Sequence, residues 1–126
     1  MAIVLRASSP VLDLDACLRW IPSRIVEAAW RVGDIRLGRS PERTAGFNLL
    51  IAESTGAATI GAAHTELLGL APHLLALSEA GIPLTLDCAL EVGPIAPKSL
   101  TLGPSFLQLL VEIGIELSVS AYPCED

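Results

Sequence analysis

The last third of the chain restricts its fold most, because the spacing of apolar residues changes there twice. Residues 83–92 alternate between apolar and polar side chains, and residues 115–122 alternate again. Between them, Gly103-Pro104-Ser105 has the composition of a helix start and Gly114 that of a helix end. A period of two is typical of a strand with one buried and one exposed face. The segment therefore predicts a strand, a helix and a second strand of a sheet that is covered on one side.

The same alternation assigns each side chain of the two strands to a face. The face toward the core is expected to carry Leu84, Leu86, Cys88, Leu90, Val92, Ile115, Leu117, Val119 and Ala121. The face toward solvent is expected to carry Thr85, Asp87, Ala89, Glu91, Glu116, Ser118, Ser120 and Tyr122. The solvent face holds carboxylates, hydroxyls and a tyrosine but no histidine or cysteine. This composition favours a docking surface over a reaction centre.

The rest of the chain predicts further strands and helices. Strands are expected at residues 2–8, 25–32 and 47–53, with a possible short strand at 99–102. Asp13 can cap a helix that Pro22 stops, and a long helix is expected from His64 to Ala80, bent or restarted at Pro72. Residues 38–46 read as a polar loop and 55–61 as a small, flexible stretch. This order predicts an α+β two-layer sandwich, with a mainly antiparallel sheet, helices on one face, and a ferredoxin-like β-α-β-β-α-β core followed by a C-terminal helix and strand.

Length and composition predict one domain over residues 1–126. The mean hydropathy of +0.57 is high. It fits either a core rich in leucine and alanine or an additional apolar patch covered by a partner or a second copy. Prolines and charges interrupt every apolar run, so no membrane span is expected, and residues 1–5 read as a strand rather than a signal peptide. Three cysteines without zinc or redox spacing favour a reduced, cytoplasmic setting.

The net charge of −6 is unevenly distributed. Residues 1–43 hold seven arginines against five acids, whereas residues 44–126 hold Lys98 against nine acids. An acidic surface repels phosphate backbones, which argues against nucleic-acid binding. It attracts basic proteins and speeds their encounter.

The candidate reactive residues are weakly patterned. His64 and His73 lie nine positions apart with Pro72 between them, which is not a metal-ligand spacing on one helix face, and a pair of Cys88 with either histidine would need long-range convergence. Asp87 and Glu91 share a strand face, which Glu53 and Glu116 could join if their strands are neighbours. As an acid–base pair these carboxylates would need a cleft, so a solvated face or a partner-binding platform is favoured. We predict no catalytic, metal or cofactor-binding residue and expect no enzymatic activity.

Trp30, Arg31 and Asp34 form the strongest cluster of interface-type residues, but the favoured interpretation is that Trp30 fills the edge of the core and Asp34 shapes the turn at Gly33. The arginines at positions 31, 36, 39 and 43 could bind an anion, or could pair with Glu27, Asp34 and Glu42. They lack the glycine-rich loop of a nucleotide site. Trp20 is expected to form a lid on the core.

Three segments, taken together, carry a family resemblance. They are the helix-initiating run from Pro10 to Leu18, the run Ala29-Trp30-Arg31-Val32-Gly33-Asp34, and the C-terminal run from Leu100 to Tyr122. With these segments the chain resembles the small bacterial family called domain of unknown function 4279. The resemblance implies a compact α+β protein, and some members of that family are encoded beside polymorphic toxins and are suspected of being immunity proteins. It implies no catalytic residues.

These observations lead to a functional hypothesis. The chain is expected to bind and neutralise a cognate toxin domain, which is expected to be basic, by occluding its active site. The predicted contacts are Glu53, Asp87, Glu91, Glu116 and Tyr122. The alternative is a dimeric small-ligand-binding or regulatory domain without catalytic activity.

Overall fold

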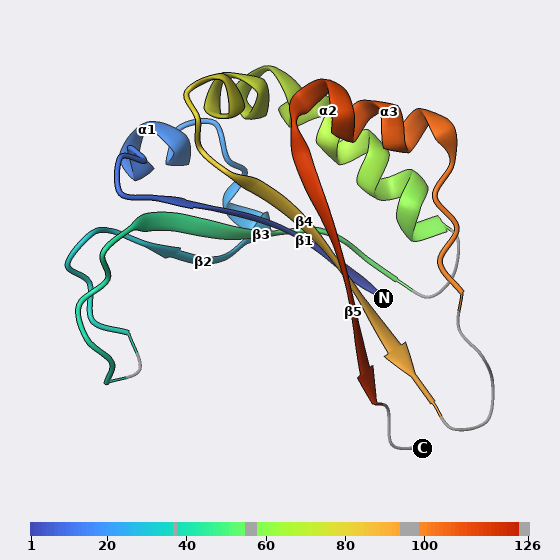
Figure 1. Cartoon of the computed structure of the whole chain (residues 1–126), viewed down its shortest axis with the longest axis horizontal. Helices are drawn as coiled ribbons and strands as arrows, with labels where there is room; N and C mark the ends of the chain where they lie inside the picture. Colours follow the sequence, from blue (N-terminus) through green and yellow to red (C-terminus); the bar gives the residue numbers. More distant parts are fainter. Residues whose placement is uncertain (37, 55–57, 94–98, 124–126) are drawn as a thin grey trace.

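A computed structural model of the chain describes residues 1–36, 38–54, 58–93 and 99–123. Lys98, Cys124 and part of the expected flexible stretch, residues 55–57, lie outside these described residues. Five strands form one sheet in the order β2-β3-β1-β4-β5, and the helices pack on one of its faces (Figure 1). The elements are β1 (Ala2–Ser9), α1 (Leu14–Leu18), the 3-10 turn η1 (Ser23–Ile25), β2 (Val26–Trp30), β3 (Ala45–Glu53), α2 (Ala58–Glu79), β4 (Leu84–Val92), α3 (Pro104–Ile113) and β5 (Ile115–Pro123).

The expected two-layer α+β architecture is confirmed. Strand β1 pairs antiparallel with β3 and with β4, and β2 pairs antiparallel with β3. The first four strands therefore have the split β-α-β arrangement of a ferredoxin-like core. Helix α3 then carries the chain to β5, which pairs parallel with β4 and ends the sheet.

Two early elements are shorter than the sequence predicts. Asp13 caps helix α1 as expected, and its Oδ1 accepts a hydrogen bond of 3.1 Å from the backbone N–H of Ala16. The helix ends at Leu18 rather than near Ile21, and Pro22 precedes the η1 turn. Strand β2 stops at Trp30, where the chain enters the turn around Gly33.

Helix α2 is longer than predicted. It begins at Ala58, six residues before His64, and continues through Pro72 as one helix. Pro72 and Leu68, which lies one turn before it, are on the exposed side. Water can therefore satisfy the Leu68 carbonyl that loses its backbone donor to the proline. No helix in the described part of the chain is long and apolar enough to cross a membrane.

The core lies between the helix layer and the sheet. Its largest fully buried side chains come from β1, β3 and β4 and from both long helices; among them are Ile3, Leu5, Phe47, Leu49, Leu67, Leu74, Leu86 and Phe106. Trp20 packs at the margin of this core as expected, edge-on to the Phe47 ring at 6.2 Å between centroids.

The C-terminal segment follows its prediction closely, with one correction. Pro104 opens α3, and Gly114 closes it in the left-handed conformation at a φ of 89°. Residues 99–102 form no strand, so the short strand expected there is wrong; Leu100 and Leu102 instead pack against the core.

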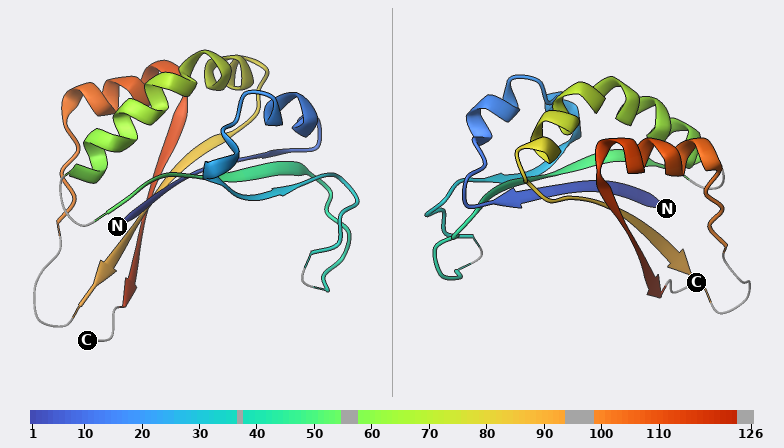
Figure 2. Two further views of the ribbon diagram at one scale, coloured as in Figure 1. Left: turned by 180° about the vertical axis from the view of Figure 1, so that it is seen from behind. Right: turned by 45° about the horizontal axis from the view of Figure 1, so that its top comes forward.

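The ends of β4 and β5 run beyond the helix layer (Figures 1 and 2). Side chains there on the helix-facing side are less covered than the alternation predicts. Val119 is 51% exposed, and Ala121 is exposed as well. The expectation that both are buried is wrong because the helices do not reach this end of the sheet.

Candidate functional site

The face of the sheet opposite the helices, which we call the open face, carries no described helix (Figure 2). Its centre is Arg6 on β1, whose partners in neighbouring strands are Asn48 on β3 and Thr85 on β4. Cross-strand partners share a face, so these three side chains form one row across the middle of the sheet. A partner of the kind predicted from the sequence would therefore dock on the open face.

The parallel pairing of β4 with β5 brings four of the five predicted contact residues together. Thr85 is opposite Glu116, Asp87 is opposite Ser118, and Glu91 is opposite Tyr122. Asp87, Glu91, Glu116 and Tyr122 consequently lie on the open face of two adjacent strands. Of these, Glu91, Glu116 and Tyr122 are exposed. We call these three residues the acidic strip.

Glu53 lies apart from the acidic strip. It is exposed at the end of β3, where it pairs with Ala2 of β1, and Ala2 pairs in turn with Ala89 of β4. Strand β1 thus separates β3 from β4, so Glu53 does not adjoin Glu91. Glu53 and Glu116 were expected to join the cluster only if their strands were neighbours of β4. Strand β5, which carries Glu116, is such a neighbour, and β3, which carries Glu53, is not.

Asp87 requires a correction, because the sequence places it in solvent and it is only 7% exposed. Its Oδ1 accepts a hydrogen bond of 2.9 Å from the Ser120 hydroxyl, and its Oδ2 is 3.4 Å from Nη2 of Arg6. Side chains from the strands on either side therefore cover the carboxylate. Asp87 positions Arg6 rather than offering its charge to a partner.

A pocket of about 440 Å³ lies on the open face around Arg6, and one of its lining residues, Thr85, is the cross-strand partner of Glu116. Its lining comes from all of the first four strands or their flanking turns, and comprises Arg6, Ala7, Ser8, Trp30, Arg36, Asn48, Pro83 and Thr85. Trp30 forms one wall. We call it the arginine pocket because Arg6 and Arg36 are the only charged residues that line it in the described part of the chain.

Trp30 lies over Gly46, its cross-strand partner on β3. A Cβ atom at Gly46 would be 2.6 Å from the Trp30 ring and 2.5 Å from the backbone oxygen of Ala7. Glycine is thus required for the indole to lie flat on the strand. Trp30 is buried, as expected, but it lies outside the main core on the open face.

Arg36 covers the Trp30 ring, with its guanidinium carbon 3.9 Å from the ring centroid. Its Nε donates a hydrogen bond of 3.0 Å to Glu42, so the expected pairing within this segment is confirmed for these two residues. Backbone hydrogen bonds of 2.8 Å join Gly33 to Glu42 and Glu42 to Asp34. The segment that carries Arg36 is therefore an ordered turn rather than a loose loop.

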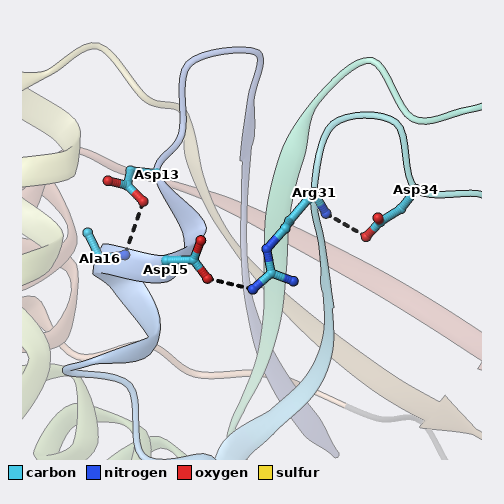
Figure 3. A network of polar contacts seen from close by, with 5 residues as sticks. All are labelled: Asp13, Asp15, Ala16, Arg31 and Asp34. Carbon is cyan, nitrogen blue, oxygen red and sulfur yellow. Dashed lines mark hydrogen bonds and ion pairs between the residues drawn. The ribbon is translucent and has the colours of Figure 1, made fainter.

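Arg31 belongs to a separate polar network (Figure 3). One Nη of Arg31 is 2.5 Å from Oδ1 of Asp15 on α1, and its backbone N–H donates to Asp34 at 2.7 Å. The hydrogen bond and charge of Arg31 lower the pKa of the Asp15 carboxyl, and Asp15 raises the pKa of Arg31. The network therefore ties α1 to the turn and engages one Nη of Arg31 with Asp15.

The histidines and the described cysteines lie on the helix side. His73 stacks on Trp20 at 4.8 Å and His64 contacts Phe106 edge-on at 5.9 Å. Burial raises the pKa of the Cys17 thiol, and it raises that of Cys88 to about 11, with a smaller contribution from Asp87. A protonated, buried thiol is a poor nucleophile. Among the described residues, no group of three or more histidines, cysteines and acids is placed to hold a metal ion.

The outer surface of the helix layer is apolar in places. Leu68 and Leu75 on α2 and Leu107 and Val111 on α3 are exposed. The high mean hydropathy therefore reflects more than a large core, although these side chains by themselves do not identify what covers them.

The sequence reasoning missed Arg6 and Asn48. Each is a polar residue at an outward position of an otherwise apolar strand, and this pattern could have indicated a polar site on the exposed face of the sheet. With the Asn48 amide oriented so that both of its groups are satisfied, its oxygen accepts from Nη1 of Arg6 at 3.3 Å. Their juxtaposition depends on strand order, which the sequence alone did not establish.

No protein-family model, curated protein or solved structure matches the chain. The resemblance to domain of unknown function 4279 consequently stays a prediction.

Proposed function

We propose that this chain is a non-catalytic binding protein that neutralises a protein toxin by covering it with the open face of the sheet. The observation that carries the proposal is the acidic strip. Glu91, Glu116 and Tyr122 are exposed on adjacent strands of a rigid sheet, on the face that the helices leave uncovered. Tyr122 lies opposite Glu91, and Glu116 lies six residues away along β5, so the strip combines an aromatic anchor for packing with carboxylates spread along the strand for recognition.

Electrostatics supports a basic partner. Glu91 and Glu116 form no ion pair with another described residue, and the chain as a whole carries a charge of −6. Unpaired surface carboxylates that share a face attract a basic surface and speed its docking. Toxin domains that attack nucleic acids are typically basic, and covering such a domain would block its substrate.

The open face also has the dimensions of an interface. An ordinary protein–protein contact covers about 800 Å² per partner. Five adjacent strands spaced about 4.8 Å apart, four of them eight or nine residues long, supply a surface of that order. The resemblance to a family suspected of supplying immunity proteins points the same way.

The test co-expresses the chain with the toxin domain encoded by its adjacent gene and measures cell survival and binding. Wild type is expected to protect cells and to form a 1:1 complex. The double variant Glu91→Lys/Glu116→Lys should associate at least about tenfold more slowly at low salt. The matched control Glu79→Lys/Glu112→Lys makes the same change in net charge on exposed positions of α2 and α3.

The control variant should bind and protect like wild type. Equal slowing in both double variants would show that total charge, not the acidic strip, controls binding. Absence of binding and protection by wild type would refute the toxin-neutralising function itself.

A further inference from the structure

We propose that the arginine pocket is a binding site for the oxyanion group of a small molecule, either a carboxylate or a phosphate. This site goes beyond the proposed toxin contact, because none of the three residues of the acidic strip lines the pocket, although Glu116 is the cross-strand partner of its Thr85. The first argument is its charge. The chain has 14 acidic and 8 basic residues, yet among the described residues the pocket is lined by two arginines and no acid.

Arg6 is oriented but not saturated. Its Nη2 is 3.4 Å from Asp87 and its Nη1 is 3.3 Å from the Asn48 oxygen, and both distances are long for charge-assisted hydrogen bonds. A guanidinium has five N–H donors. The Arg6 side chain is 47% exposed, so donors remain for a ligand that enters from the open side.

The contacts that fix the Arg36 side chain leave its two Nη groups available to a ligand. The Trp30 ring supports its guanidinium from below, and only Nε is engaged, by Glu42. Its two Nη groups have no hydrogen-bond partner in the described part of the chain. Since Trp30 and Glu42 have already fixed the side chain, binding a ligand costs little further rotamer entropy.

The remaining lining suits an oxyanion on a small organic body. Ser8 and Thr85 provide hydroxyl donors, and Trp30 and Pro83 provide apolar contact. The volume of about 440 Å³ lies within the range of small-molecule sites. Two arginine forks can engage one carboxylate or phosphate bidentately, as lysines cannot. The pocket therefore favours a small anion over a neutral metabolite.

Trp30 provides the reporter for the test. The chain has two tryptophans, so a Trp20→Phe variant leaves Trp30 as the only one. Its fluorescence is titrated at constant ionic strength with inorganic phosphate in one arm and with succinate in the other, and sodium chloride serves as the blank. The expected result is a saturable change with at least one of the two anions, and the responding arm identifies the class of oxyanion.

Arginine variants establish where the anion binds. Arg36→Gln in the Trp20→Phe background should weaken binding by about tenfold or more, because it removes charge-assisted hydrogen bonds. Arg6→Lys retains the charge that Asp87 requires but loses the fork, so it should fold and still bind more weakly. The control Arg24→Gln removes a positive charge on the helix side, where Arg24 pairs with Glu66 at 3.3 Å. It should bind like its parent. No saturable response to either anion, or equal weakening by Arg24→Gln, would overturn the proposal.

Discussion

Gly46 offers the sharpest test of how the open face is built. A Cβ atom at this position would be 2.5 Å from the Ala7 oxygen, 2.6 Å from the Trp30 ring and 2.8 Å from the Ser8 Cβ. Ordinary contacts of this kind are about 1 Å longer. The substitution Gly46→Ala must therefore separate β3 from β1 or displace Trp30 from the strand.

The expected cost follows from these contacts. Overpacking in a well-packed region costs about 1–3 kcal/mol. Backbone atoms of β1 cannot move aside as a flexible side chain can, so we expect the upper end of this range. Displacement of Trp30 would also lose its contact with Arg36, worth about 0.5–1 kcal/mol. Together these give a loss of about 3–4 kcal/mol, a large share of the about 5–15 kcal/mol typical of a domain.

The assay is urea denaturation followed by far-UV circular dichroism, with Gly69→Ala as the matched control. Gly69 lies inside α2, and a Cβ atom there would meet nothing within 4 Å. That substitution should raise the free energy of unfolding by about 0.5–1 kcal/mol, because alanine is the better helix former. If Gly46→Ala unfolds within about 1 kcal/mol of wild type, Trp30 does not lie on Gly46 as described.

Three further predictions concern titratable groups. Burial raises the Cys88 pKa from 9.0 to about 11, so deprotonation of this thiol favours the unfolded chain. The urea midpoint should therefore fall as the pH rises from about 9 toward 11, and Cys88→Ala should make that fall smaller. A parallel fall in wild type and in the variant would contradict this prediction. Asp87→Asn should lower the free energy of unfolding by about 1–2 kcal/mol, and exposed Glu91→Gln by less than about 0.5 kcal/mol; equal effects in urea denaturation would mean that Asp87 is not buried and bonded. In an NMR titration the Asp15 pKa should rise in Arg31→Gln, and an unchanged value would exclude their ion pair.

The elements that the sequence predicted well are those with local signals. Pro104 and Gly114 mark the ends of α3 through their own backbone preferences, and the alternation in β4 and β5 sets their faces. The start of α2 was missed because residues 58–63 are small except for Ile60 and carry no strong helix-start signal. Such a segment becomes helical through packing of Thr59 and Ala63, which sequence spacing alone does not reveal.

The arrangement of the site depended on contacts between distant parts of the chain. Asp87 is 81 positions from Arg6 and 33 from Ser120, so its burial follows from β4 lying between β1 and β5. Val119 was expected in the core because alternation gives the face of a residue but not how far the helices extend over it. Glu116 could be placed on the same face as Glu91, conditionally, because both strands were recognised and only their adjacency was open.

The central claim, that the open face contacts the partner, is tested most directly by site-specific photo-crosslinking in the complex with the toxin domain. The photoreactive residue p-benzoylphenylalanine replaces Tyr122 on the open face or, in a separate variant, Val111, which is 74% exposed on α3 in the helix layer. The account predicts a crosslink to the toxin domain from position 122 and none from position 111. A crosslink from position 111 alone would contradict it.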